Sequence, residues 1–326
     1  MKFPWTKKNT ASAQDDILKE DQTILTEEAK EEFPETEIPE ELSAEETHEK
    51  SGRGDRNPFH PPYLIMLILM VGVFSLSQLL TKQQSFDHGK SAYGELEQYV
   101  DVYVPGQLPS SGDDANQQTE TISMDDQEEV KADLYRQLQN IGADFAALGE
   151  INSDVAGWIQ IPNTKINYPI AQSGDNSYYL RHMFNKEYNA GGGIFLDYRN
   201  SSNFSSKHSI LYGHQMGNGT MFTNINNYKN QSYYDGHTYG LLYTPSGNYV
   251  VEFFAGYTTS NSGDGWDLRF RTDEEFEDWI ASQISKSDFS AGFTPSSSDR
   301  ILTLSTCSSA FDNAKYVLHG VLRNSA

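Results

Sequence analysis

One long stretch that is both uncharged and apolar constrains the architecture of the chain most. Residues 63–80 read YLIMLILMVGVFSLSQLL and contain no charged side chain. As an α-helix they would extend ~27 Å, close to the ~30 Å hydrocarbon thickness of a bilayer. A buried core helix is disfavoured because such helices carry a polar stripe over this length. A cleaved signal peptide is disfavoured because the run is long and begins far from the N-terminus. The pattern predicts one membrane-spanning helix.

Basic residues around the apolar run predict its orientation. Lys50, Arg53 and Arg56 precede the run, whereas Lys82 and Lys90 come after it. Because basic residues concentrate on the cytoplasmic side of a membrane helix, this bias favours a cytoplasmic N-terminus. We therefore expect a single-pass protein of the cell membrane whose large C-terminal part is extracellular.

The segment before the run, residues 1–62, is predicted to be a disordered acidic tail. The formal net charge of the chain is −22, and between residues 11 and 49 fifteen acidic side chains stand against two lysines. So few apolar residues accompany this charge that the segment cannot offset the entropy cost of ordering. The chain has no basic patch, so nucleic acid is not expected as a partner.

Two further segments precede the strand-rich part of the chain. Residues 81–127 are rich in Ser, Gln, Asp and Gly, which predicts a flexible extracellular spacer. Residues 128–149 place apolar side chains at helical spacing and predict an amphipathic helix that docks on the folded domain. Those side chains are Leu134, Leu138, Ile141 and Phe145. The globular domain is therefore expected over residues 128–326.

From residue 151 onward the pattern is that of β-structure. Eight short apolar or alternating runs are separated by Gly, Asn, Ser and Pro clusters, which predicts a mainly β barrel or sandwich. The runs are GWIQI, INYPIA, GIFLDY, SILYGH, YGLLYT, YVVEFFAGYTT, RILTLSTC and YVLHGVL. One late helix is predicted at residues 273–287, with Phe276, Trp279, Ile280 and Ile284 on one face. A shorter helix is predicted shortly after His214.

Cys307 is the only cysteine of the chain and ends a predicted strand. It cannot form an intramolecular disulfide, and an unpaired thiol outside the cell is open to unwanted cross-linking. Another role must therefore explain its presence. Strand alternation places Cys307 and Ser305 on one face, with Leu302 and Leu304 on the other face toward the core. A buried, inert cysteine is the structural alternative.

His214 ends another predicted strand in a similar way, and alternation places Tyr212 on the same face. A thiol attacks carbonyl groups as the thiolate, which a nearby imidazole or cation favours. A catalytic role therefore requires Cys307 and His214 to meet. The histidines lack the spacing of a zinc site, so no metal or other cofactor is expected.

Four separated motifs follow one another along the chain: GWIQIPNTKINYPIAQSGDNSYYL, GGGIFLDYRN, ILYGHQMGNGTMF and TLSTC. Together they resemble the sortases, the membrane-anchored cysteine transpeptidases of Gram-positive bacteria, and class B most closely. The resemblance implies an eight-stranded sortase-type β-barrel with peripheral helices and a thioester mechanism. It also implies that Cys307 is the nucleophile and His214 the catalytic histidine. Four residues would line the substrate groove: Ser305, Tyr212, Asn176 and Leu180.

The chain departs from the family pattern at one position. Class B enzymes usually carry an arginine eight residues after the cysteine, whereas this chain has Lys315 there. Lysine keeps the positive charge but lacks the planar fork that holds two oxygens at once. Two interpretations remain open: a retuned sortase that uses Lys315 in catalysis, or a weak or inactive relative that only binds sorting signals. A Cys-His peptidase of the cell wall is a further alternative.

The resemblance also implies the partners. The substrates would be secreted proteins with C-terminal sorting signals, cleaved through a thioester acyl-enzyme. The acceptor would be an amine of a peptidoglycan precursor or of a pilin. Such a reaction fits a domain tethered to the outer face of the membrane by one helix.

Overall fold

The computed structural model describes residues 61–101, 135, 141–260, 262–307, 310 and 313–324. The predicted tail up to residue 60 lies outside the described residues, as do residues 102–127 of the predicted spacer and the side chains of Leu134 and Leu138. The prediction of a disordered tail therefore stays a prediction.

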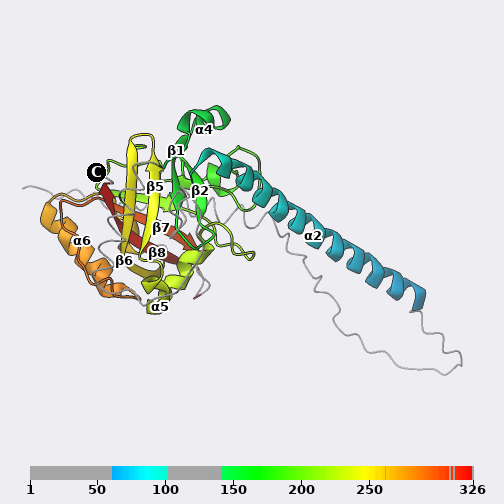
Figure 1. The fold of residues 1–326 in the computed structure, drawn as a ribbon. Helices are drawn as coiled ribbons and strands as arrows, with labels where there is room; N and C mark the ends of the chain where they lie inside the picture. The colour runs from blue at the N-terminus through cyan, green and yellow to red at the C-terminus, as the bar shows by residue number, and fades with distance from the viewer. Residues whose placement is uncertain are drawn as a thin grey trace, which may run out of the picture. The chain divides into compact units, whose positions relative to one another are not determined.

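Eight strands close into a barrel, which confirms the β-structure predicted from the alternating runs and the barrel that the family resemblance implies (Figure 1). Their order around the barrel is β1-β2-β3-β4-β7-β8-β6-β5. The pairs β2/β3 and β4/β7 are parallel, and the other neighbours are antiparallel. The strands are β1 Val155–Gln160, β2 Asn167–Ala171, β3 Ile194–Leu196, β4 His208–Tyr212, β5 Tyr239–Thr244, β6 Gly247–Ser260, β7 Ile301–Cys307 and β8 Ala314–Asn324.

Helices flank the barrel. The predicted late helix is confirmed as α6, Asp273–Lys286, which packs against β6 (Figure 1). Thr272 caps it by accepting a hydrogen bond from the Glu275 N–H, and three acidic residues in its first turn suit the helix dipole. The short helix predicted after His214 is a 3-10 segment, η3 Phe222–Lys229. The remaining elements are α2 Pro61–Leu96, η1 Glu97–Tyr99, α4 Phe145–Ile151, η2 Tyr178–Leu180, α5 Gln231–Asp235 and η4 Asp264–Trp266.

Strand β7 is buried on both faces. Leu302 and Leu304 belong to the main core, as alternation predicts. On the opposite face, Ile301 packs in a second apolar cluster with Trp279 and Ile280 of α6. The helix thus covers the outer face of β7 near its start, and the strand leads from there to Cys307.

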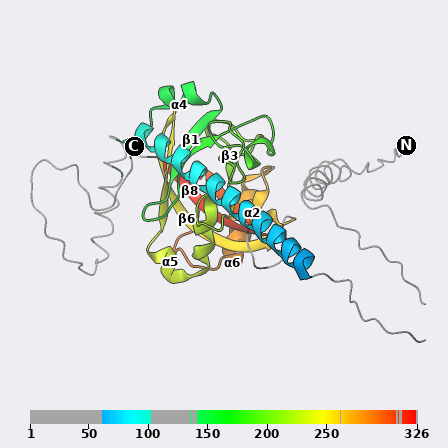
Figure 2. The same ribbon diagram turned by 90° about the vertical axis from the view of Figure 1, so that its right-hand side faces the viewer.

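The prediction of a flexible spacer starting at residue 81 is wrong for its first part. Helix α2 continues to Leu96 without interruption (Figure 2). Its C-terminal part packs on the domain core, where Tyr93 and Leu96 are buried. Ala92, Tyr93, Leu96 and Tyr99 recur at helical spacing, and this apolar face outweighs the polar composition that suggested a spacer.

The predicted docking helix is interrupted before its last part. Residues 141–144 are not helical, and Ala143 forms a β-bridge with Val100. Helix α4 begins only at Phe145, because the Asp144 side chain caps it by accepting from the Ala147 N–H. Ile141 and Phe145 do pack against the core, as their spacing predicts.

Candidate active site

Cys307 lies at the C-terminal end of β7, partly buried. Antiparallel pairing with β8 places Lys315 directly opposite it, and the Lys315 Nζ donates a hydrogen bond to the Cys307 Sγ at 3.1 Å. The side chain of Asn226, from η3, donates to the Cys307 carbonyl oxygen at 3.2 Å. The sulfur is therefore held at a defined position beside a cation.

His214 lies two residues beyond the end of β4. Strand β4 pairs in parallel with β7, with Tyr212 beside Ser305, and the Gly213 N–H donates to the Ser305 carbonyl oxygen at 3.1 Å. This register brings the ends of the two strands together, so that His214 and Cys307 are in contact. The meeting of thiol and imidazole that catalysis requires is thus present.

The orientation of the His214 ring is set by its partner. Its Nε2 lies 2.7 Å from the carbonyl oxygen of Leu180. A carbonyl oxygen only accepts, so Nε2 carries a proton. Nδ1 is then the nitrogen left to exchange a proton with the sulfur of Cys307.

The site favours the thiolate. The hydrogen bond with His214 is the largest influence on the pKa of Cys307 and lowers it. Burial acts to raise this pKa, whereas the charge and hydrogen bond of Lys315 lower it further. Together they lower the pKa of Cys307 to about 7. At neutral pH a large share of the sulfur is therefore ionised, as a cysteine nucleophile requires.

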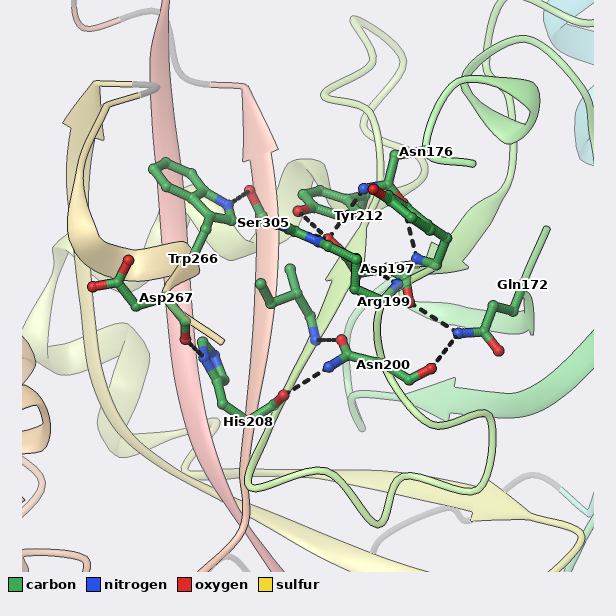
Figure 3. Close-up of polar contacts among 12 residues, drawn as sticks. Gln172, Asn176, Asp197, Arg199, Asn200, His208, Tyr212, Trp266, Asp267 and Ser305 are labelled. Atoms are coloured by element: carbon green, nitrogen blue, oxygen red, sulfur yellow. Dashed lines mark hydrogen bonds and ion pairs between the residues drawn. The ribbon is translucent and has the colours of Figure 1, made fainter. Parts of the chain in front are cut away.

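A polar network centred on Asp197 includes Tyr212, two residues before His214 (Figure 3). This buried carboxylate forms an ion pair with Arg199 and accepts hydrogen bonds from the Tyr212 hydroxyl and the Asn176 side chain. Burial acts to raise the pKa of Asp197, but the Arg199 hydrogen bonds and charge outweigh it, and the pKa lies below its usual value.

Three of the predicted groove residues therefore have partners within the protein. Asn176 and Tyr212 are held by Asp197, and Ser305 is buried and accepts a hydrogen bond from the Trp266 ring at 3.1 Å (Figure 3). Leu180 is partly buried, and its backbone oxygen, not its side chain, contacts His214. Substrate contact by these four residues stays a prediction.

Sequence reasoning missed Asp197, Arg199, Trp266 and Asn226. A signal existed for Asp197 alone, because it directly follows a buried strand within the motif GGGIFLDYRN. Trp266 and Asn226 lie in connecting segments, and their contacts come from residues distant in the chain.

A second polar cluster, at the start of β4, is completely enclosed. His208 is bonded through Nδ1 to the Asp267 carbonyl oxygen and through Nε2 to the Thr303 hydroxyl, which also contacts Nδ1 of His319. Burial lowers the pKa of His208 to about 4 and that of His319 well below its usual value. Among the described residues no group of three or more His, Cys, Asp or Glu side chains could hold a metal ion.

Comparisons with known proteins agree with this geometry. The model of the family described as Sortase domain matches residues 159–323. Sortase B of Listeria monocytogenes is 36% identical over 177 residues, which cover 54% of this chain and 72% of the relative. Sortase B of Staphylococcus aureus is 32% identical over 178 residues, covering 55% and 73%.

Solved structures show the same likeness. The crystal structure of Staphylococcus aureus sortase B superposes with a TM-score of 0.54 at 28% identity, covering 60% of this chain and 96% of that one. The structure of Clostridium perfringens sortase B gives a TM-score of 0.53 at 35% identity, covering 56% and 100%.

A closed eight-stranded barrel that brings together a thiol, an imidazole and a cation where β4 and β7 end and β8 begins defines a cysteine transpeptidase of the sortase type. The chain belongs to the sortase family, and within it to class B. The resemblance carried by the four motifs is confirmed.

Proposed function

We propose that this chain is an active, membrane-anchored class B sortase in which Cys307 is the nucleophile, His214 the general acid and base, and Lys315 the cationic group. The observation that carries the proposal is the contact of one sulfur with both groups: Lys315 donates to it at 3.1 Å, and His214 lowers its pKa. An inert structural cysteine has no need of such surroundings.

In the first half-reaction the Cys307 thiolate attacks the carbonyl carbon of a threonine in the sorting signal. A C–S bond forms, and the C–N bond of the scissile peptide breaks. Protonated His214 gives its Nδ1 proton to the departing amine, while the Nε2–H stays on the Leu180 carbonyl oxygen. The product is a thioester acyl-enzyme. Lys315 stabilises the thiolate and the negative charge that develops on the carbonyl oxygen.

In the second half-reaction an amine attacks the thioester. His214 Nδ1 removes the proton from the amine, an amide bond forms, and the C–S bond breaks to return the thiolate. The acceptor is an amine of a peptidoglycan precursor or of a pilin. Similar solved structures include a sortase B–substrate complex of Staphylococcus aureus and a sortase B complexed with triglycine. These support a peptide substrate and an amine acceptor.

Helix α2 supplies the anchor. Its apolar side chains between residues 65 and 80 are exposed, and the helix is long and apolar enough to cross a membrane. The basic residues that precede the span favour a cytoplasmic N-terminus. The barrel would then lie outside the cell, where secreted substrates and wall precursors meet.

Intact-mass measurement of the full-length protein in nanodiscs tests the proposal. The protein is incubated with a library of sorting peptides, with and without triglycine, and Cys307→Ala serves as the control. We expect an acyl-enzyme adduct that is absent from the control, and a peptide–triglycine product. An adduct that yields only hydrolysed peptide indicates a Cys-His peptidase instead. Peptide binding with no adduct indicates an inactive relative and overturns the proposal.

A further inference from the structure

We infer that Tyr93 of helix α2 is a positioning residue for His214, and this rests on the proposed function. Tyr93 is buried at 8% exposure, and its ring packs edge-on against Tyr168. Its hydroxyl donates to the Gly192 carbonyl oxygen at 2.8 Å and accepts from the Phe184 N–H at 3.3 Å. One side chain of α2 thus joins two points of the segment between β2 and β3.

Gly192 transmits this contact to the peptide that holds the histidine. It has a φ of +56°, and a Cβ at this position would lie 2.5 Å from the carbonyl oxygens of both Tyr179 and Leu180. The next residue, Gly193, donates its N–H to the Tyr179 carbonyl oxygen at 2.9 Å. The backbone around Gly192 therefore packs directly on the Leu180 peptide, with no side chain between them.

The Leu180 carbonyl oxygen is the partner of His214 Nε2 at 2.7 Å. That bond decides which ring nitrogen carries the proton and leaves Nδ1 for the sulfur. The path from α2 to the imidazole consequently has two links after Tyr93: the Gly192 backbone and the Leu180 carbonyl group. Both links are backbone groups, so the sequence pattern gives no sign of them.

Other contacts bind α2 to the same segment, but they are weaker candidates for this role. The Asn189 side chain donates to the Ser85 carbonyl oxygen at 2.9 Å, and His88 contacts Glu187 at 2.8 Å. The His88–Glu187 pair is exposed on both sides, and exposed pairs contribute little. The Tyr93 hydroxyl is enclosed, and its loss would leave a buried acceptor and a buried donor unsatisfied.

Tyr93→Phe removes the hydroxyl and keeps the ring that packs on Tyr168. Without the hydroxyl, the Gly192 backbone can shift and the Leu180 carbonyl group no longer holds His214 Nε2 in one place. We expect the pKa of Cys307 to rise above about 7, because the hydrogen bond with His214 is the main cause of its lowering. We also expect kcat to fall about tenfold while KM for the sorting peptide stays near wild type.

Tyr234→Phe is the matched control. Tyr234 is buried to 6% exposure, and its hydroxyl also donates to a backbone carbonyl oxygen, that of Phe253 at 3.3 Å. Its ring stacks on Phe289, on a different part of the domain from Leu180 and His214. Both variants lose one buried hydroxyl, and the melting temperature of each variant reports the loss of stability that accompanies it.

The experiment measures the rate of Cys307 alkylation by iodoacetamide against pH for full-length protein in nanodiscs, together with kcat, KM and melting temperature. An alkylation midpoint displaced upward in Tyr93→Phe and unchanged in Tyr234→Phe supports the inference. A midpoint at the wild-type value in Tyr93→Phe overturns it, whether or not the melting temperature falls. Alkylation needs no substrate. If the wild-type protein forms no acyl-enzyme, the proposed function is wrong, but the alkylation experiment still tests the role of Tyr93.

Discussion

Two histidines of the motif HSILYGH, which strand alternation assigns to one face, have opposite surroundings in the structure. His214, beyond the end of β4, is partly exposed, with one ring nitrogen on a carbonyl oxygen and the other beside a thiol. His208, at the start of β4, is fully enclosed, and both of its nitrogens have protein partners. Position along the strand, and not residue type, thus separates the proposed proton-transfer group, His214, from a structural one.

The proton positions in the enclosed cluster can be deduced by counting donors. His208 Nδ1 faces a carbonyl oxygen and must donate. Because burial keeps the ring neutral, His208 Nε2 accepts the single proton of the Thr303 hydroxyl, and His319 Nδ1 must then donate to that hydroxyl. This leaves the lone pair of His319 Nε2 buried and without a partner. The cluster has one stable proton arrangement and serves the fold.

Replacing each histidine with glutamine tests the different roles of His214 and His208 most directly. We expect His214→Gln to lower kcat about 100- to 10,000-fold with little change in stability, because a general acid and base is lost. His208→Gln should lower stability and leave the activity per folded molecule near wild type. Steady-state transpeptidation and urea unfolding of both variants check this. Equal loss of activity in the two, with normal folding, would contradict the division of roles.

Substitutions of Lys315 test the role of the cation beside Cys307. Lys315→Ala removes the donor that lies 3.1 Å from the sulfur, so the pKa of Cys307 should rise and turnover of a sorting peptide should fall, by about 100-fold if the group also stabilises the oxyanion. Lys315→Arg keeps the charge and should retain most of the activity. If both variants turn over substrate like wild type, Lys315 has no catalytic part.

The pH dependence of stability tests the assignment of His208 as a buried, neutral side chain. The pKa of His208 is about 4 in the folded state, against about 6.5 in an unfolded chain. Between these values the unfolded state binds a proton that the folded state does not, so the free energy of unfolding falls as pH falls from about 6.5 to about 4. The loss from His208 alone is about 3 kcal/mol. Urea unfolding across this window should show a shallower pH slope for His208→Gln, and an unchanged slope would contradict the assignment.

The smallest predicted effect separates two buried threonines of β7. Thr303→Val leaves two ring nitrogens without a partner and should cost about 1–3 kcal/mol of unfolding free energy. Thr306 is equally buried, but its hydroxyl has no partner, so Thr306→Val should be neutral or stabilising. Denaturant unfolding of the two variants measures the difference, and equal destabilisation would argue against the hydrogen-bonded cluster.

The parts of the molecule that could be predicted from the sequence are those that local patterns determine. Eight strands and α6 could be found because alternation, helical spacing and turn residues mark them. The meeting of Cys307, His214 and Lys315 could be expected from two strand ends and one family position. The closed barrel, in place of a sandwich, came from the family resemblance and not from the pattern.

The rest depended on contacts between distant residues. The Leu180 carbonyl group holds His214, yet any residue type supplies a carbonyl oxygen, so the side chain at position 180 carries no signal. Asp197 gathers Asn176 and Tyr212 from different segments. Helix α2 was cut short in the prediction because polar composition was given more weight than the apolar face around Tyr93.

The proposed chemistry depends on Cys307 being a thiolate nucleophile made by its two neighbours. Because the chain has one cysteine, the ultraviolet absorbance of the thiolate in full-length protein, measured against Cys307→Ala, reports that group alone. We predict a titration midpoint near 7, moved upward in His214→Gln and Lys315→Ala. A midpoint near the ordinary thiol value of about 8.5 that neither substitution moves would contradict this prediction.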